Sequence, residues 1–249
     1  MTDLHRATIV VSGAGTGIGR AAARRLAAEG RHVTLVGRRR AKLEEAAAES
    51  AAGDVLVVDA DVSTPEGARG VAAAVRAAGL RCAGVVASAG GNAPPAADDS
   101  LESIRDHWRA GFDLNVMTAV LLIEALRSDL EQSGGRVVLL SSVAALRGSR
   151  TGSYGASKAA LHAWMFDLAA QLGRSGGTAN IVAPGFVPGT EFWAGVSGEV
   201  VQNRVAQTLV GRVGDADEIA GLIAWLLGPD AAWVTAQIIS PNGGMVLGR

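Results

Sequence analysis

The stretch Ala7-Thr8-Ile9-Val10-Val11-Ser12-Gly13-Ala14-Gly15-Thr16-Gly17-Ile18-Gly19 joins an apolar run to a glycine-rich turn. Beyond it, Ile18, Ala22 and Leu26 recur at helical spacing, which predicts a helix that begins in the turn. Glycines between a strand and a helix let the backbone turn tightly and approach a pyrophosphate, which the helix N-terminus stabilises. The stretch therefore predicts the first strand, turn and helix of a dinucleotide-binding domain.

Further apolar runs follow at regular intervals, separated by alanine-rich segments long enough for crossover helices. The predicted strands are Ala7–Val11, His32–Val36, Asp54–Val58, Ala83–Ala87, Arg136–Leu140, Thr178–Val182 and Ala236–Ile239. Nearly continuous apolar residues are typical of parallel strands that are covered on both faces. We therefore expect an α/β fold, a Rossmann-like, doubly wound, mainly parallel seven-stranded sheet with helices on both faces. No repeat or linker interrupts the chain, which indicates one domain over residues 1–249.

Composition excludes several classes of function. A formal net charge of −1 gives no general attraction for nucleic acid or an anionic membrane. The longest apolar runs are too short to span a membrane, and residues 1–6 lead into the first strand without a signal-peptide core. The single cysteine, Cys82, allows no internal disulfide, and the four histidines lack metal-ligand spacing. We expect a cytoplasmic protein with no metal site.

The only tyrosine of the chain stands four residues before one of its only two lysines, in Tyr154-Gly155-Ala156-Ser157-Lys158. Residues i and i+4 lie on the same face of a helix. A nearby cation lowers the pKa of a phenol from its ordinary value of about 10, which suits the phenol to general acid–base chemistry. A solvated pair on a helix surface is the alternative interpretation of this motif alone.

Several motifs occur together in a fixed order. They are Gly13-x-x-x-Gly17-x-Gly19, Asp113-Leu114-Asn115-Val116, Ser141-Ser142-Val143-Ala144, Tyr154-x-x-x-Lys158 and Pro184-Gly185. In this combination the chain resembles the classical short-chain dehydrogenase/reductase family, which includes the 3-oxoacyl-carrier-protein reductases, over essentially its whole length. Ser88 departs from the family pattern, which usually has asparagine at that position.

The resemblance implies a nicotinamide dinucleotide as cofactor. The implied contacts are Gly13, Thr16, Gly17, Ile18, Gly19, Arg38, Arg39, Asp61, Val62, Ala89, Gly90, Tyr154, Lys158, Pro184, Gly185, Val187 and Thr190. An acidic residue after the second strand would bind a ribose 2′-hydroxyl, whereas arginine accommodates a 2′-phosphate. The second strand leads into Arg38-Arg39-Arg40, so the sequence favours NADP(H) over NAD(H). Asp61 has a second interpretation, as the cap of the following helix.

The resemblance also implies four catalytic residues, Asn115, Ser142, Tyr154 and Lys158. Ser142 would polarise a carbonyl, with Ser141 not excluded from that role, and Tyr154 would transfer the proton. Lys158 would lower the pKa of Tyr154 and bind ribose. Asn115 stands in a helix expected over roughly Ser100–Ser133, where an asparagine taken alone indicates a kink or a satisfied core amide. The resemblance implies instead that Asn115 holds the backbone and water of a proton relay. The implied reaction is reduction of a ketone, or oxidation of the corresponding secondary alcohol.

The substrate follows less directly from the residues. Apolar side chains over residues 186–212 suggest a lid above a hydrophobic carbonyl or alcohol substrate, which could be a 3-oxoacyl thioester. The alternative is another amphipathic helix packed on the core. The family resemblance implies a homo-oligomer, a tetramer or a dimer. Competing hypotheses are an NADP(H)-sensing binding protein without catalytic activity, and a dehydratase or epimerase that regenerates its nicotinamide.

Overall fold

The computed structural model describes residues 7–50, 54–149, 152–188 and 195–248. The strands are β1 (Ala7–Ser12), β2 (His32–Gly37), β3 (Val55–Asp59), β4 (Arg81–Ala87), β5 (Arg136–Leu140), β6 (Thr178–Val182) and β7 (Ile238–Ile239). The longer helices are α1 (Gly17–Ala28), α2 (Arg40–Glu49), α3 (Pro65–Ala77), α4 (Leu101–Phe112), α5 (Thr118–Ser133), α7 (Ser153–Gly173), α8 (Gly198–Val205) and α9 (Ala216–Leu226). Short helical segments are η2 (Asp113–Met117), α6 (Ala144–Arg147) and η4 (Pro229–Ala231).

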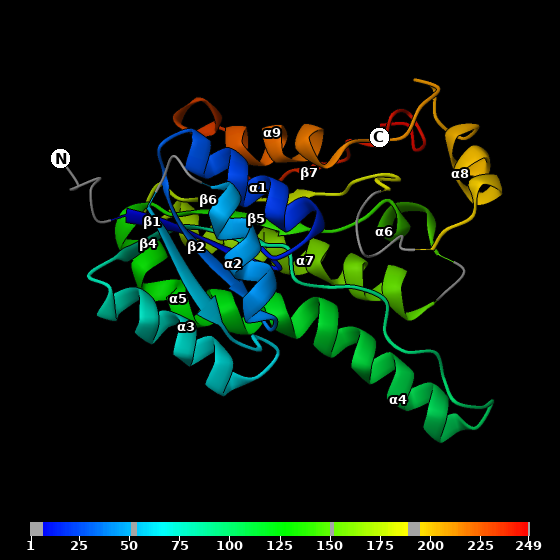
Figure 1. Cartoon of the computed structure of the whole chain (residues 1–249), viewed down its shortest axis with the longest axis horizontal. Coiled ribbons are helices and arrows are strands. Elements are labelled where there is room, and N and C mark those ends of the chain that lie inside the picture. Colours follow the sequence, from blue (N-terminus) through cyan, green and yellow to red (C-terminus); the bar gives the residue numbers. More distant parts are fainter. Residues whose placement is uncertain (1–6, 51–53, 150–151, 189–194, 249) are drawn as a thin grey trace.

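The sheet has the order β3-β2-β1-β4-β5-β6-β7, and each neighbouring pair is parallel. One face is covered by α1, α2 and α9, and the other by α3, α5 and α7, as the two buried apolar clusters and Figure 1 show. The expected doubly wound α/β fold is therefore confirmed. Strand order reverses between β1 and β4, so the loops after these strands diverge there and leave the crevice in which such folds bind ligands.

Local signals fix where individual helices begin. Thr64 caps α3 by accepting a hydrogen bond from the Gly67 amide at 3.1 Å, and Pro65 follows at the first helical position. Asp215 and Glu218 form a reciprocal capping box at the start of α9. These caps place the loops before α3 and α9 without help from distant residues.

Two predicted boundaries were wrong. The single helix expected over Ser100–Ser133 is two helices joined by the π-helical turn η2, which contains Asn115. The last strand is only Ile238–Ile239, because Ala236 has a φ of +58° and so leaves the extended conformation. The other strands differ from expectation by at most two residues at an end.

Candidate active site

A cavity of about 650 Å³ lies at the carboxyl ends of the parallel strands. The turn after β1, the segment after β2 and the loops after β3, β4, β5 and β6 all contribute to its wall. The strand ends meet here because all seven strands run in the same direction.

Most of the predicted site residues line this cavity. They are Gly13, Thr16, Gly17, Ile18, Arg38, Arg39, Asp61, Val62, Ala89, Gly90, Ser142, Tyr154, Lys158, Pro184, Gly185 and Val187. Two others, Gly19 and Asn115, are buried behind the wall. Thr190 lies outside the described residues.

The glycine-rich turn leaves no room for side chains. A Cβ at Gly13 would lie 3.0 Å from the Ala89 nitrogen, and one at Gly19 would lie 2.4 Å from the Gly13 carbonyl oxygen. Gly13 and Gly17 have φ angles of +67° and +56°, which favour glycine. The Ser12 hydroxyl accepts hydrogen bonds from the Ser88 and Ala89 amides at 3.1 Å and so fastens the turn to the loop after β4. Bare backbone and the N-terminus of α1 thus face the cavity, as a pyrophosphate requires.

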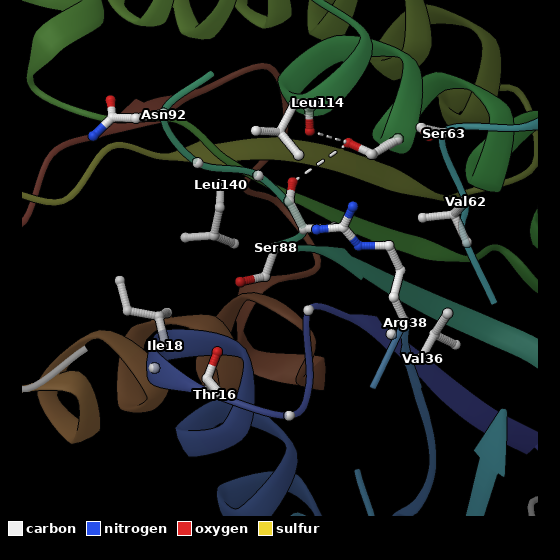
Figure 2. Close-up of a pocket in the computed structure, with 18 of the residues that line it drawn as sticks. Thr16, Ile18, Val36, Arg38, Val62, Ser63, Ser88, Asn92, Leu114 and Leu140 are labelled. Atoms are coloured by element: carbon white, nitrogen blue, oxygen red, sulfur yellow. Dashed lines mark hydrogen bonds between the residues drawn. The ribbon is translucent and has the colours of Figure 1, made fainter. Parts of the chain in front are cut away.

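Basic side chains gather where β2 enters α2. Figure 2 shows Arg38 extending into the cavity from the end of β2. No ion pair of Arg38 occurs among the described residues, whereas Arg40 pairs with Glu44 and Asp59, each at 2.9 Å. Lys42 also lines this wall, although the sequence analysis assigned it no role. Its position in the first turn of α2, directly after the three arginines, is the signal that could have identified it.

The Asp61 carboxylate stabilises the turn between β3 and α3. It accepts hydrogen bonds from the Ser63 amide at 3.0 Å and hydroxyl at 2.6 Å, and these bonds, the hydroxyl bond foremost, hold the pKa of Asp61 below its ordinary value. The interpretation of Asp61 as a helix cap was wrong, because Thr64 caps α3. Thr64 directly precedes Pro65, so its hydroxyl is the one that reaches the first-turn amides.

The two adjacent serines after β5 face different ways. The Ser141 hydroxyl is buried, 3.1 Å from the Lys158 carbonyl oxygen and 2.8 Å from Nε2 of His162. Ser142 instead lies on the cavity wall beside the phenol of Tyr154 and favours its ionised form, while its Oγ accepts a hydrogen bond from the Ala144 amide at 3.1 Å. Of the two hydroxyls, that of Ser142 is therefore the one placed beside the phenol.

Burial controls the proton affinities of Tyr154 and Lys158. Burial raises the pKa of Tyr154, and the neighbouring Ser142 hydroxyl opposes this rise only in part. Lys158 is 4% exposed, and burial lowers its pKa to about 8. Its ammonium donates to the Leu140 carbonyl oxygen at 2.8 Å. The expected lowering of the Tyr154 pKa is thus not what this geometry gives, because the cost of charging a partly buried phenol dominates.

Asn115 is fully engaged with backbone. Its Oδ1 accepts from the Gly91 amide at 2.9 Å, and its Nδ2 donates to the carbonyl oxygens of Gly91 at 2.9 Å and Gly111 at 3.0 Å. A Cβ at Gly90 would lie 2.6 Å from Asn115 Oδ1 and 2.9 Å from Lys158 Nζ, so these two side chains meet behind Gly90. Asn115 therefore fixes the loop after β4 from within η2.

The described part of the chain has neither a metal-binding cluster nor a membrane-spanning helix. It contains no group of three or more His, Cys, Asp or Glu side chains arranged to hold a metal ion. None of its helices is long and apolar enough to cross a membrane.

Comparison with known proteins agrees with this geometry. A family model described as enoyl-(acyl carrier protein) reductase matches residues 13–246. The chain is 31% identical to the 3-oxoacyl-[acyl-carrier-protein] reductase of Escherichia coli over 96% of each chain. It is 32% identical to an NADPH-dependent aldehyde reductase-like protein of Arabidopsis thaliana over 95% of this chain and 93% of the relative.

Solved structures give the same answer. L-sorbose reductase from Gluconobacter frateurii, complexed with NADPH and L-sorbose, superposes with a TM-score of 0.88 at 26% identity, over 97% of each chain. With the family model and the close relatives, this match shows that this chain is an oxidoreductase of the classical short-chain dehydrogenase/reductase family, similar to its 3-oxoacyl-carrier-protein reductases.

Proposed function

We propose that the protein is an NADP(H)-dependent oxidoreductase that reduces a ketone to a secondary alcohol, or oxidises that alcohol. The observation that carries the proposal is that Ser142 and Tyr154, two residues with hydroxyl groups, lie together on the wall of one cavity. Arg38 lines the same cavity from the end of β2. Three strand spacings of about 4.8 Å separate β2 from β5, which suits a ligand that reaches from a phosphate to a reacting ring.

The residues of the cavity fit a phosphorylated dinucleotide. The Gly13–Gly19 turn would hold the pyrophosphate, Arg38 and Arg39 the 2′-phosphate, and Asp61 with Val62 the adenine. Ala89 and Gly90 would line its middle, and Pro184, Gly185, Val187 and Thr190 the nicotinamide side. When bound, the nicotinamide supplies or accepts the hydride. NADPH in the structure of the sorbose reductase and in the name of the plant relative supports the preference for NADP(H).

Side chains of the protein transfer the proton. Ser142 donates a hydrogen bond to the substrate oxygen and stabilises the negative charge that develops there. Tyr154 gives its phenolic proton to that oxygen in reduction and takes it back in oxidation. The ammonium of Lys158 sits behind Gly90 with Asn115, where it binds ribose and stabilises the phenolate once formed. Asn115 keeps the Gly91 backbone in place for this relay.

The wall of the cavity includes apolar side chains. Leu114 and Val187 line it, and we propose a hydrophobic carbonyl substrate, with a 3-oxoacyl thioester as one candidate. We further propose that residues 186–212, of which 189–194 lie outside the described residues, form a lid of the single domain. No residue of α8 is buried, and Arg147 donates to Gln207 at 2.9 Å, which fastens this segment beside the loop after Ser142.

Two broader features belong to the proposal. We propose a homo-oligomer, a tetramer or a dimer, because α4 exposes Leu101, Ile104, Trp108 and Phe112 along its length. Light scattering after size-exclusion chromatography measures the assembly. We also propose a cytoplasmic location, which the free, buried thiol of Cys82 supports.

The test is oxidation of NADPH, with NADH in parallel, over a panel of ketones and one 3-oxoacyl thioester. Tyr154→Phe should lower kcat by about 10²–10⁴-fold, because it removes the proton donor, while the dissociation constant for NADPH stays within about twofold. Undiminished turnover by this variant would remove Tyr154 from the mechanism. Tight cofactor binding with no turnover in either direction would instead support a cofactor sensor.

A further inference from the structure

The loop between β4 and α4 forms part of the cavity wall, but few hydrogen bonds hold it to the rest of the fold. Gly91 and Asn92 line the cavity, and Figure 2 shows Asn92 at its edge. The segment continues as Ala93-Pro94-Pro95. Proline has no backbone N–H, so this segment can be held at its prolines only through its carbonyl oxygens.

One such carbonyl is held by a histidine of α4. Nδ1 of His107 lies 2.6 Å from the Pro94 carbonyl oxygen, and Nε2 lies 2.7 Å from the Ser153 hydroxyl. Among the described residues, the contact with His107 is the single hydrogen bond that holds the chain between Gly91 and Asp98. A carbonyl oxygen can only accept, so Nδ1 carries a proton, and in the neutral ring Nε2 accepts the proton of Ser153.

The other end of this bridge is the start of the catalytic helix. Ser153 is 1% exposed and directly precedes Tyr154. A Cβ at Gly111, one turn after His107 on α4, would lie 3.1 Å from Ser153 Cβ and Oγ, so the two helices touch here. The carbonyl oxygen of Gly111 also accepts a hydrogen bond from the side-chain Nδ2 of Asn115. His107 and Asn115 thus hold the same loop at Pro94 and at Gly91, from one continuous helical segment.

We propose that His107 is a positioning residue that clamps the substrate-side wall, Asn92 to Pro94, to the N-terminus of α7 and so sets the distance between that wall and Tyr154. His107 touches neither the cavity nor the proposed reacting groups. The inference rests on the proposed carbonyl chemistry for its kinetic consequence, whereas the clamp itself is a property of the folded chain.

The kinetic test compares four variants with wild type. His107→Ala should raise KM for the carbonyl substrate about five- to tenfold, the effect of losing hydrogen bonds of ordinary strength, while kcat and the dissociation constant for NADPH change less than threefold. His107→Asn keeps an N–H near the position of Nδ1, so it should retain the Pro94 contact and give a smaller rise. Ser153→Ala should match His107→Asn, because both lose only the Ser153 contact. Arg105→Ala is the control, since this exposed residue of α4 forms an ion pair with its neighbour Asp106 and none with another described residue.

A double-mutant cycle and hydrogen exchange separate the clamp from general stability. His107→Ala combined with Ser153→Ala should be no worse than His107→Ala alone, because both changes break one bridge. In His107→Ala, backbone amides of residues 89–93 should exchange faster than in Arg105→Ala. This measurement needs no turnover, so it tests the clamp even where the assay finds no substrate. Additive effects, unchanged exchange, or a loss of NADPH affinity equal to the rise in KM would overturn the proposal.

Discussion

For Lys158 and Tyr154, the cost of burying a charge is the main cause of the shift in pKa. Lys158 is almost fully buried with one carbonyl partner, and burial lowers its pKa from 10.5 to about 8. The folded chain therefore releases this proton at a lower pH than the unfolded chain does. Between about pH 8 and 10.5 the unfolded chain holds more protons, so the free energy of unfolding rises with pH through that window.

This gives a pH prediction for Lys158. Between pH 7.5 and 9.5, the free energy of unfolding of the wild type should rise by about 2 kcal/mol relative to that of Lys158→Met, which has nothing to titrate there. Urea unfolding of both proteins at the two pH values measures the difference. The window stays below the raised pKa of Tyr154, which would act in the opposite direction at higher pH. Parallel behaviour of the two proteins would contradict the lowered pKa.

Arg38 and Arg40 differ in what surrounds them, although they are two residues apart. Arg40 is occupied by Glu44 and Asp59, whereas Arg38 lines the cavity. Arg38→Ala should lower kcat/KM with NADPH about 10- to 100-fold, as expected for a charge-assisted hydrogen bond, and leave the value for NADH within twofold.

The matched control for this experiment is Arg40→Ala, which should leave kcat/KM unchanged with NADPH and with NADH. Steady-state kinetics with both cofactors measures the preference. If Arg38→Ala lowered kcat/KM equally with NADPH and NADH, Arg38 would not bind the 2′-phosphate.

At the scale of elements, the irregular segments do most of the positioning. The π-helical turn η2 contains Asn115, whose side chain contacts Gly90 and Gly91 from behind. The turn before α3 shows the same dependence on close contact. A Cβ at Gly67 would lie 2.0 Å from the Asp61 carbonyl oxygen, whereas nothing lies within 4 Å of one at Gly70.

The two glycines of α3 therefore make a matched pair. Gly70→Ala should raise the free energy of unfolding by about 0.5–1 kcal/mol, because alanine loses less entropy in a helix. Gly67→Ala should lower it by about 1–3 kcal/mol through overpacking and should weaken NADPH binding, because Asp61 lines the cavity. Urea unfolding and a cofactor titration measure both effects. Equal stabilisation by the two changes would show that the turn at Asp61 adapts freely.

At the scale of the whole molecule, the cavity joins loops from both halves of the sheet. A ligand that bridges them should stabilise the fold as a unit, since it binds only the folded chain. NADPH at about 100 times its dissociation constant should add about 2.7 kcal/mol, which corresponds to a rise in Tm of about 5–10 °C for a chain of this size. Thermal unfolding with NADPH, and with NADH at the same concentration, measures it. A larger rise with NADH would contradict the assignment of Arg38.

The sequence by itself determined the doubly wound sheet, because continuous apolar strands alternate with helix-forming segments and the strand ends then fall at one edge. It also determined which short motifs would meet there, since each follows a strand. Only the tertiary structure decided that Ser142 rather than Ser141 faces Tyr154, that η2 interrupts the helix at Asn115, and that His107 bridges Pro94 and Ser153. It also reversed the expected shift of the Tyr154 pKa. These features depend on which side chains are buried against one another across elements, and spacing along the chain does not encode the loss of water around a group.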